Sequence, residues 1–166
     1  MKENINVKKI TLLGIGIALY VVLSFAIKIP LISHIQTDLG YIAFGAMCAI
    51  AGVPALIVGV FGCLLESLFM TGWVPIGWMI GQGIIGIICG YAYKKNKNIW
   101  LNIIITIVAI LIGIGGIKTI IECYLYAIPF AVKIPKNLIA SVADMVPMIG
   151  GYLLAIKTPI KRYITK

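Results

Sequence analysis

Long uncharged apolar runs constrain the fold of this chain more than any other feature of its sequence. Residues 10–27 contain no charged side chain, and further apolar runs follow as far as residue 157. Only 11% of the residues are charged and 61% are hydrophobic, whereas about a quarter of a soluble domain is charged. Charges are too few to cover a surface that faces water, so the sequence predicts one all-α transmembrane domain over residues 1–166.

The basic residues indicate how such a domain is oriented. A net charge of +9 could suggest nucleic acid as a partner, but most basic residues flank apolar runs. They fall into three clusters: Lys2, Lys8 and Lys9; Lys94, Lys95 and Lys97; and Lys157, Lys161, Arg162 and Lys166. This distribution follows the positive-inside rule, so we interpret the basicity as a topology signal and expect no nucleic-acid partner.

An even number of membrane crossings must separate clusters that all lie in the cytoplasm. The apolar material divides into six predicted spans: 9–29, 38–52, 54–71, 76–93, 99–121 and 136–157. The longer predicted breaks are 30–37 and 124–135. The first run lacks a small-residue cleavage site, so we expect it to be a retained span. Both termini are then cytoplasmic, in a bacterial cell membrane.

Several motifs suggest chemistry that their context excludes. Residues 81–86 match a dinucleotide fingerprint, but no strand precedes them. Residues 113–119 resemble a phosphate loop, but Ile117 separates the glycine from Lys118. The cysteines lie inside apolar runs without metal-ligand spacing, and we expect them to be reduced packing residues: Cys48, Cys63, Cys89 and Cys123. We expect no cofactor, no metal and no ATP hydrolysis by this chain.

Four acids at membrane depth mark the candidate site: Asp38, Glu66, Glu122 and Asp144. A charge within a bilayer is costly, so the acids should face protein or a wet cavity. Glu66, with Trp73 on the same predicted helical face, is expected to meet Trp78 and Gln82 across the connection 71–77. Carboxylate and amide groups would orient a solute and the indoles would stack on it. An interfacial aromatic belt is the alternative for the tryptophans, and an ion pair with a lysine such as Lys118 is the alternative for the acids.

The sixth predicted span and the first outer loop add further candidates. Asn137, Asp144 and Gly151 recur at seven-residue intervals and so share one helix face. Pro147 leaves the Ala143 carbonyl without its helical donor beside Asp144. Three aromatic residues are expected to form a rim or lid: Tyr124, Tyr126 and Phe130. His34 is expected in a loop as a possible ligand contact. Since no nucleophile lies with a base, the sequence does not predict an enzyme.

Small residues allow helices to approach closely in lipid. Gly14 and Ala18 form such a pair on the first predicted span, where they serve either internal packing or an external partner helix.

The sequence resembles the substrate-binding S components of energy-coupling factor (ECF) transporters nearly end to end. The resemblance rests on LLGIGIALYVVLSFAIKIP, GAMCAIAGVPALIVGVFGCLLESL and IGWMIGQGIIGIICGYAYKK, and YAIPFAVKIPKNLIASVADMVPMIGGYLLA is most similar to the riboflavin-type subgroup. It implies capture of a vitamin or related micronutrient, such as riboflavin or a modified base, at the outer face. It also implies a transmembrane T subunit that docks on an Ala-xxx-Ala pattern, here Gly14 and Ala18, and two ABC ATPases as partners beside membrane lipid.

A self-sufficient channel or secondary transporter is the alternative function. It would need an inverted repeat or a polar path across the membrane. We find no repeat, and the predicted cytoplasmic halves of the spans contain few polar residues.

Overall fold

The computed structural model describes residues 7–26, 28–32 and 35–158, with residues 28–32 and 35–36 described as backbone only. Apolar sequences form helices over most of this length. The longer helices are α1 (Val7–Ala26), α2 (Gly40–Ala51), α3 (Leu56–Thr71), α4 (Ile76–Lys95), α5 (Ile99–Ile110), α6 (Thr119–Tyr126) and α7 (Phe130–Lys157). A 3-10 turn, η1 (Val53–Ala55), joins α2 to α3, and a π-helix, η2 (Leu111–Lys118), joins α5 to α6.

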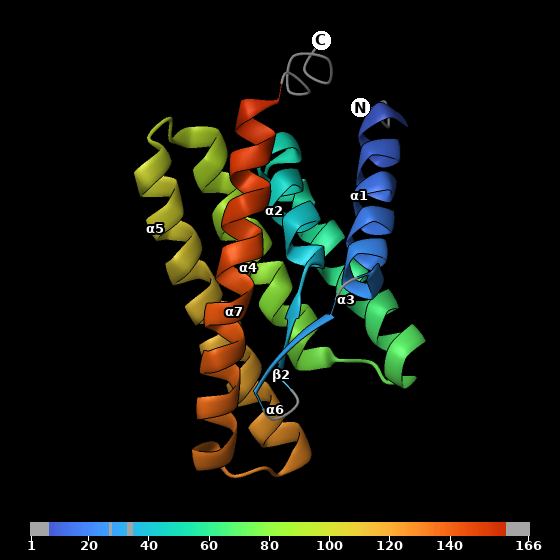
Figure 1. Ribbon diagram of the computed structural model, residues 1–166, viewed down its shortest axis with the longest axis vertical. Coiled ribbons are helices and arrows are strands. Elements are labelled where there is room, and N and C mark those ends of the chain that lie inside the picture. Colours follow the sequence, from blue (N-terminus) through green and yellow to red (C-terminus); the bar gives the residue numbers. More distant parts are fainter. Residues whose placement is uncertain (1–6, 27, 33–34, 159–166) are drawn as a thin grey trace, which may run out of the picture.

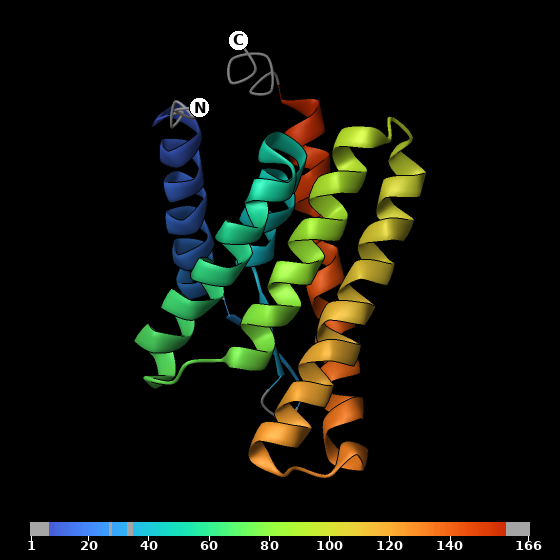
Figure 2. The same cartoon turned by 180° about the vertical axis from the view of Figure 1, so that it is seen from behind.

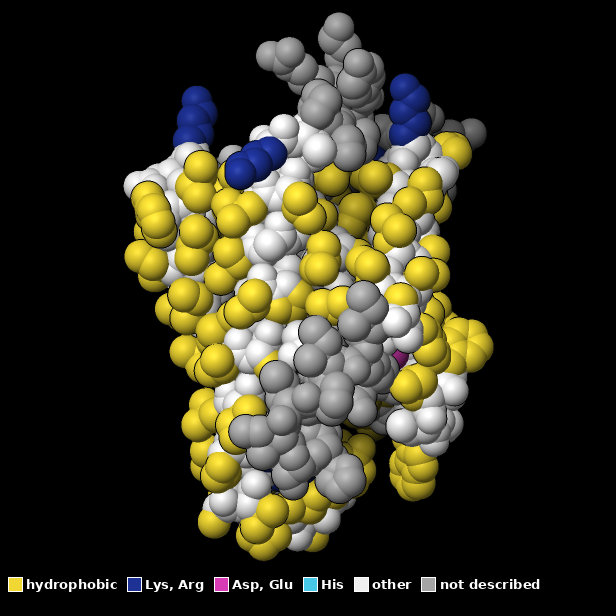
Figure 3. Space-filling view, in the orientation of Figure 1, with side chains coloured by type: hydrophobic (Ala, Val, Ile, Leu, Met, Phe, Trp, Pro, Cys, Tyr) yellow, Lys and Arg dark blue, Asp and Glu magenta, His cyan; other side chains and the backbone are white. Residues whose placement is uncertain are grey.

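The helices run roughly along the long axis of the molecule (Figures 1 and 2). The two ends of this axis differ in charge. The start of α1, the α4–α5 turn and the end of α7 lie together at one end, called here the basic end (Figure 1). Lysine side chains are visible at this end, above sides covered by apolar groups (Figure 3). The half of the bundle nearer the α3–α4 and α6–α7 connections contains the described acids, and we call it the acidic half. Its acids are Asp38, Glu66, Glu122 and Asp144.

Among the described residues, five helical segments are long and apolar enough to cross a membrane. They are Val7–Ala26, Val53–Thr71, Ile76–Lys95, Ile99–Tyr126 and Phe130–Lys157. Helix α2 is also apolar, but it has only 12 residues. The architecture is therefore a helical membrane bundle, as the composition predicted.

A β-hairpin replaces the predicted loop 30–37, so the expectation of a purely helical chain is wrong at this point. Strands β1 (Lys28–Ile32) and β2 (Ile35–Asp38) pair in an antiparallel ladder that sets Lys28 opposite Asp38. Isoleucine and threonine favour extended backbone, and pairing satisfies backbone N–H and C=O groups. The end of β2 packs against α7, which brings Asp38 into the interior.

The predicted break 124–135 is also wrong for most of its length. Helix α6 continues to Tyr126, and α7 already begins at Phe130 and passes through Pro135. Proline there frees only the carbonyl of Ala131, an exposed residue near the start of the helix. The cost of the missing hydrogen bond is small in that place, so the helix starts earlier than the proline suggested.

Glycines let α2 and α7 touch backbone to backbone. A Cβ atom built on Gly151 would lie 2.0 Å from the carbonyl oxygen of Ile42, and one on Gly45 would lie 2.1 Å from that of Met148. Gly45 and Gly151 thus serve internal packing, which was also one of the two alternatives for Gly14. That alternative is wrong for Gly14, which is exposed and has nothing within 4 Å of a built Cβ; Ala18 is exposed as well.

A buried polar cluster lies in the basic half, where the sequence was expected to contain few polar groups. The side chains of Tyr93, Asn102, Thr106 and Tyr152 are buried and connected by hydrogen bonds. Only the packing of α4, α5 and α7 gathers these four side chains.

Candidate functional site

Asp38 is the centre of the polar network in the acidic half. Its carboxylate accepts hydrogen bonds from the Tyr20 hydroxyl at 2.7 Å, the Ser24 hydroxyl at 2.6 Å and the backbone N–H of Gly40 at 2.7 Å. Its own N–H donates to Asp144 Oδ1 at 3.3 Å. One residue at the end of β2 thereby connects α1, α2 and α7.

Helix α4 extends this network with two side chains that the sequence singled out. The Gln82 amide is fully buried and donates through Nε2 to the Tyr20 hydroxyl at 3.3 Å. Its Oε1 is buried and has no hydrogen-bond partner among the described residues. Trp78, one turn earlier, donates through Nε1 to the Tyr41 hydroxyl at 3.3 Å.

Glu66 and Trp78 line a small cavity between α3, α4 and the end of β2. The cavity has a volume of about 170 Å³, and Thr37, Asp38, Ser67, Met70 and Thr71 complete its wall. Glu66 is buried, with 6% of its surface exposed. The expected approach of Glu66 and Trp78 across the α3–α4 connection is confirmed, and the cavity offers carboxylates and hydroxyls to a solute.

The glycine segment before α6 places a lysine beside this cavity. The π-helical turns of η2 end at Lys118, which is 7% exposed, and Lys118 Nζ lies 4.2 Å from the centroid of the Trp78 ring. This distance is typical of a cation–π contact. Lys118 also lies 4.0 Å from Glu122 Oε1, while Lys133 Nζ lies 2.8 Å from Glu122 Oε2. The ion-pair alternative is therefore confirmed for Glu122.

The predicted polar face of α7 is buried, but its members contact different neighbours. Asn137 donates to Thr119 Oγ1 at 2.9 Å and to Glu122 Oε2 at 3.3 Å, and so joins the ion-pair cluster. Asp144 joins the Asp38 network. Gly151 contacts α2 and carries no polar side chain.

Two predicted aromatic contacts lie away from this cavity. The left-handed conformation of Gly72 ends α3, so Trp73 does not share a helix face with Glu66 and is 72% exposed. Tyr124 on α6 is 88% exposed, and Tyr126 and Phe130 are about half exposed. His34 lies outside the described residues.

Three side chains on α1 and α2 that hold Asp38 and Trp78 were not predicted from the sequence: Tyr20, Ser24 and Tyr41. Tyr20 and Ser24 lie four residues apart on the buried face of α1, and Tyr41 lies at the start of α2. Polar side chains spaced by one turn inside an apolar span were a readable signal. Asp38 was recognised as an acid at membrane depth but was not assigned to the site.

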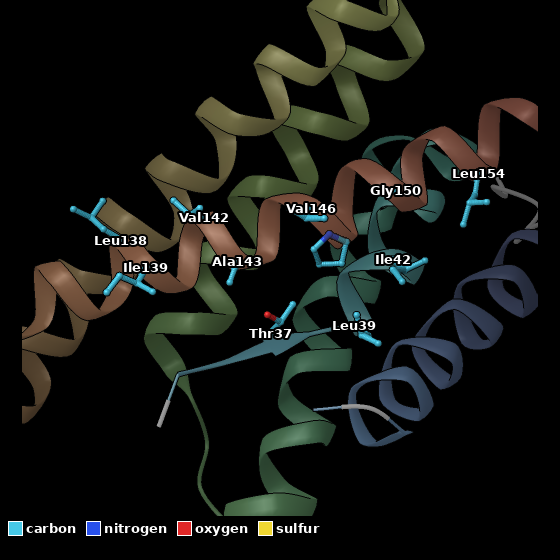
Figure 4. Close-up of a pocket in the computed structure, with 11 residues that line it drawn as sticks. Thr37, Leu39, Ile42, Leu138, Ile139, Val142, Ala143, Val146, Gly150 and Leu154 are labelled. Carbon is cyan, nitrogen blue, oxygen red and sulfur yellow. The ribbon is translucent and has the colours of Figure 1, made fainter. Parts of the chain in front are cut away.

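A larger hollow nearby is almost wholly apolar. This groove of about 990 Å³ runs between α7 and the segment from β2 to α2, and Thr37 is its main polar side chain (Figure 4). Ala143 and Pro147 belong to its wall. A polar solute finds too few partners there, whereas acyl chains or an apolar helix match its surface.

The arrangement can hold a solute but has no grouping typical of catalysis. Within residues 7–26 and 37–158, no group of three His, Cys, Asp or Glu side chains could hold a metal ion. The four cysteines are buried free thiols, as packing residues should be. These features define an integral membrane protein with a polar pocket in one half.

Comparison with known proteins then identifies the family. Residues 4–159 match the family described as "ECF-type riboflavin transporter, S component", and the chain belongs to that family. It is a family of transporter components and not of enzymes.

Curated relatives and solved structures are similar to most of this chain. A UPF0397 protein of Enterococcus faecalis is 29% identical, with 93% of this chain and 91% of that protein covered. A UPF0397 protein of Lactobacillus helveticus is 30% identical, with 87% and 72% covered. Among solved structures, FolT bound with folic acid has a TM-score of 0.70 at 24% identity, covering 92% of this chain and 94% of FolT. The biotin S component of an ECF-type ABC transporter has a TM-score of 0.63 at 16% identity, covering 100% and 95%. At these identities the two structures show a shared fold.

Proposed function

We propose that this protein is the substrate-capture subunit of an ECF-type ABC importer and binds a flat, neutral heteroaromatic vitamin such as riboflavin in the acidic half. The observation that carries the proposal is the cavity lined by Asp38, Glu66 and Trp78 in a chain of this family. The helical bundle would cross the membrane six times, with α2 as the short span. The basic end would face the cytoplasm, following the positive-inside rule.

The balance of donors and acceptors favours a solute that donates hydrogen bonds. Carboxylates of Asp38 and Glu66 line the cavity, Asp144 lies directly behind Asp38, and the buried Gln82 Oε1 is a further acceptor close to the Tyr20 hydroxyl. A ribityl chain and a flavin imide supply O–H and N–H donors. A dicarboxylate such as folic acid would instead bring two negative charges toward this acidic wall.

The size of the cavity implies movement on binding. Its 170 Å³ is smaller than the roughly 300–1,000 Å³ of typical ligand pockets. The β1–β2 hairpin and the α3–α4 connection border it and would have to separate. Trp73, Tyr124 and His34 remain proposed rim contacts. Trp73, on the α3–α4 connection, would cover the solute as these segments close again. Asn137 would act indirectly, by fixing the Glu122 cluster behind Lys118.

The exposed face of α1 is the proposed contact for a T subunit. Gly14 and Ala18 are exposed small residues with open space in front of Gly14, so a partner helix could approach the backbone closely. The opposite face of α1 carries Tyr20 and Ser24, which hold Asp38. Two ABC ATPases bound to the T subunit would supply the energy for delivery.

A titration of the purified protein in detergent tests the proposed substrate. Riboflavin, folic acid and biotin are added separately, and heat release and tryptophan fluorescence are measured. We expect saturable binding of riboflavin with quenching, and at least tenfold weaker binding of folic acid. Tight folate binding with no response to riboflavin would reject the argument from acceptor groups. No binding of any flat heteroaromatic vitamin would reject the function.

The channel alternative conflicts with the layer between the two polar clusters. Four fully buried apolar residues form this layer: Ile85 on α4, Ile110 on α5, Ile114 on η2 and Met148 on α7. Along the chain, each of them lies between a polar residue of one cluster and a polar residue of the other cluster. A continuous polar path would have to cross this layer. Liposomes containing only this protein should take up no vitamin, and uptake without ATPases would favour the channel.

A further inference from the structure

A second cavity opens at the basic end, far from the proposed vitamin site. It has a volume of about 340 Å³ and lies between the ends of α2, α4 and α7 and the α4–α5 turn. Its wall includes Tyr93, Lys94, Asn96, Lys97 and Tyr152. The stacked rings of Tyr93 and Tyr152, with centroids 4.2 Å apart, form a firm base for it.

The charge of this cavity is uncompensated within the described chain. Lys94 and Lys97 line it, whereas every described carboxylate belongs to the acidic half, where the ion pairs of the described residues also lie. Two lysines at a cavity without an acid favour an anionic ligand.

A buried hydroxyl supplies a directed donor in the same wall. Tyr152 is 3% exposed, and its hydroxyl accepts a hydrogen bond from Asn102 Nδ2 at 2.8 Å. The same nitrogen donates to the Asn96 carbonyl at 3.1 Å, and this carbonyl fixes which end of the amide is the donor. Asn102 Nδ2 therefore occupies a lone pair of Tyr152, and the hydroxyl proton has no acceptor among the described residues. It is available to a ligand in the cavity.

The surroundings are those of a membrane–water boundary. Trp100 at the start of α5 is 76% exposed and Tyr91 on α4 is 58% exposed, and aromatic residues of this kind gather at headgroup level. Basic pockets between transmembrane helices at that level bind the headgroups of anionic lipids.

We propose that the cavity at the basic end binds the phosphate headgroup of an anionic phospholipid. Lys94 and Lys97 pair with the phosphate charge, and the Tyr152 hydroxyl donates to a phosphate oxygen. The acyl chains extend along the apolar surface of the bundle. This site is independent of the vitamin cavity and of which vitamin binds there.

Native mass spectrometry of the delipidated full-length protein tests the proposal. Phosphatidylglycerol is titrated against phosphatidylcholine, whose headgroup carries no net charge, and against soluble glycerol phosphate. We expect preferential retention of phosphatidylglycerol. The double variant K94Q/K97Q should bind it roughly 30-fold more weakly, because each lysine contributes about fivefold near an anionic headgroup. Y152F, which removes one hydroxyl, should also weaken binding.

K95Q is the control because it removes one positive charge from a lysine next to Lys94 that does not line the cavity. Lys95 Nζ lies 3.2 Å from the Tyr91 hydroxyl, and Lys95 does not line the cavity. Its phosphatidylglycerol affinity should stay within about twofold of the original. Equal loss in K95Q and K94Q/K97Q would reduce the effect to general surface charge and overturn the proposal. Equal retention of both lipids, or equally tight binding of glycerol phosphate, would overturn it as well.

Discussion

Substitution of Gly151 by alanine should test how closely α2 and α7 must approach for the site to form. A Cβ at this position would lie 2.0 Å from the Ile42 carbonyl oxygen and 2.7 Å from its carbonyl carbon. These are backbone atoms in the first turn of α2, and they cannot rotate away as a side chain can. The two helices must separate instead. Gly150, its neighbour on α7, has nothing within 4 Å of a built Cβ and provides the matched control.

The two variants isolate the steric cost. Gly→Ala in a helix gains up to about 1 kcal/mol from helix propensity, and both substitutions receive this gain because both positions lie inside α7. Overpacking of a close contact costs about 1–3 kcal/mol. G151A should therefore be less stable than G150A by about 1–3 kcal/mol. It should also bind the vitamin more weakly, because separation of α2 from α7 lengthens the 3.3 Å contact between Asp38 N and Asp144 Oδ1.

The buried cysteines provide the assay. Cys48, Cys63, Cys89 and Cys123 are buried thiols, so a thiol-reactive dye reports unfolding of the protein in detergent as each thiol becomes accessible. We expect G150A to unfold at the original temperature or slightly above it, and G151A several degrees lower. Equal or higher stability of G151A relative to G150A would refute the argument that the helices touch through their backbones.

The remaining predictions concern the pocket and the exposed face of α1. E66Q should weaken riboflavin binding by about 1–3 kcal/mol in calorimetry, whereas E122Q, which changes an ion pair outside the cavity, should preserve affinity; equal losses would remove Glu66 from the site. D38N should lower stability by about 1.5–3 kcal/mol in the dye assay, because three donors lose a charged acceptor. G14L should leave binding intact and reduce T-subunit recovery in a pull-down, and undiminished recovery would contradict docking on α1.

The helical class of the fold could be predicted from the sequence because lipid and apolar side chains leave few alternatives. A long uncharged apolar run that crosses lipid must satisfy its own backbone hydrogen bonds, so it forms a helix whichever helices pack beside it. The failures occurred where local signals were read without tertiary context. Pro135 was read as a helix break although its lost hydrogen bond falls on an exposed carbonyl, and residues 30–37 were read as a loop although extended backbone can pair with itself.

The positions of the polar side chains around the cavity were predicted in part for a similar reason. Glu66, Trp78 and Gln82 were recognised because polar groups in apolar helices are costly and therefore informative. The predicted helix face shared by Trp73 and Glu66 is wrong, because Gly72 adopts a left-handed conformation and ends α3 at Thr71. The contribution of Asp38 depends on the hairpin, which delivers a loop acid into the helix interior, and periodicity along a single helix contains no information about such a contact.

Asp38 also explains why packing and binding cannot be separated in this molecule. The carboxylate that borders the cavity holds α1 through Tyr20 and Ser24 and the start of α2 through the Gly40 N–H, while its backbone holds Asp144 on α7. A solute that displaces one of these donors from Asp38 would loosen a contact to α1 or to α2. Helix α1 also presents Gly14 and Ala18 on its outer side. The same helix therefore connects the cavity, through Tyr20 and Ser24 on its inner side, to the surface proposed for the T subunit.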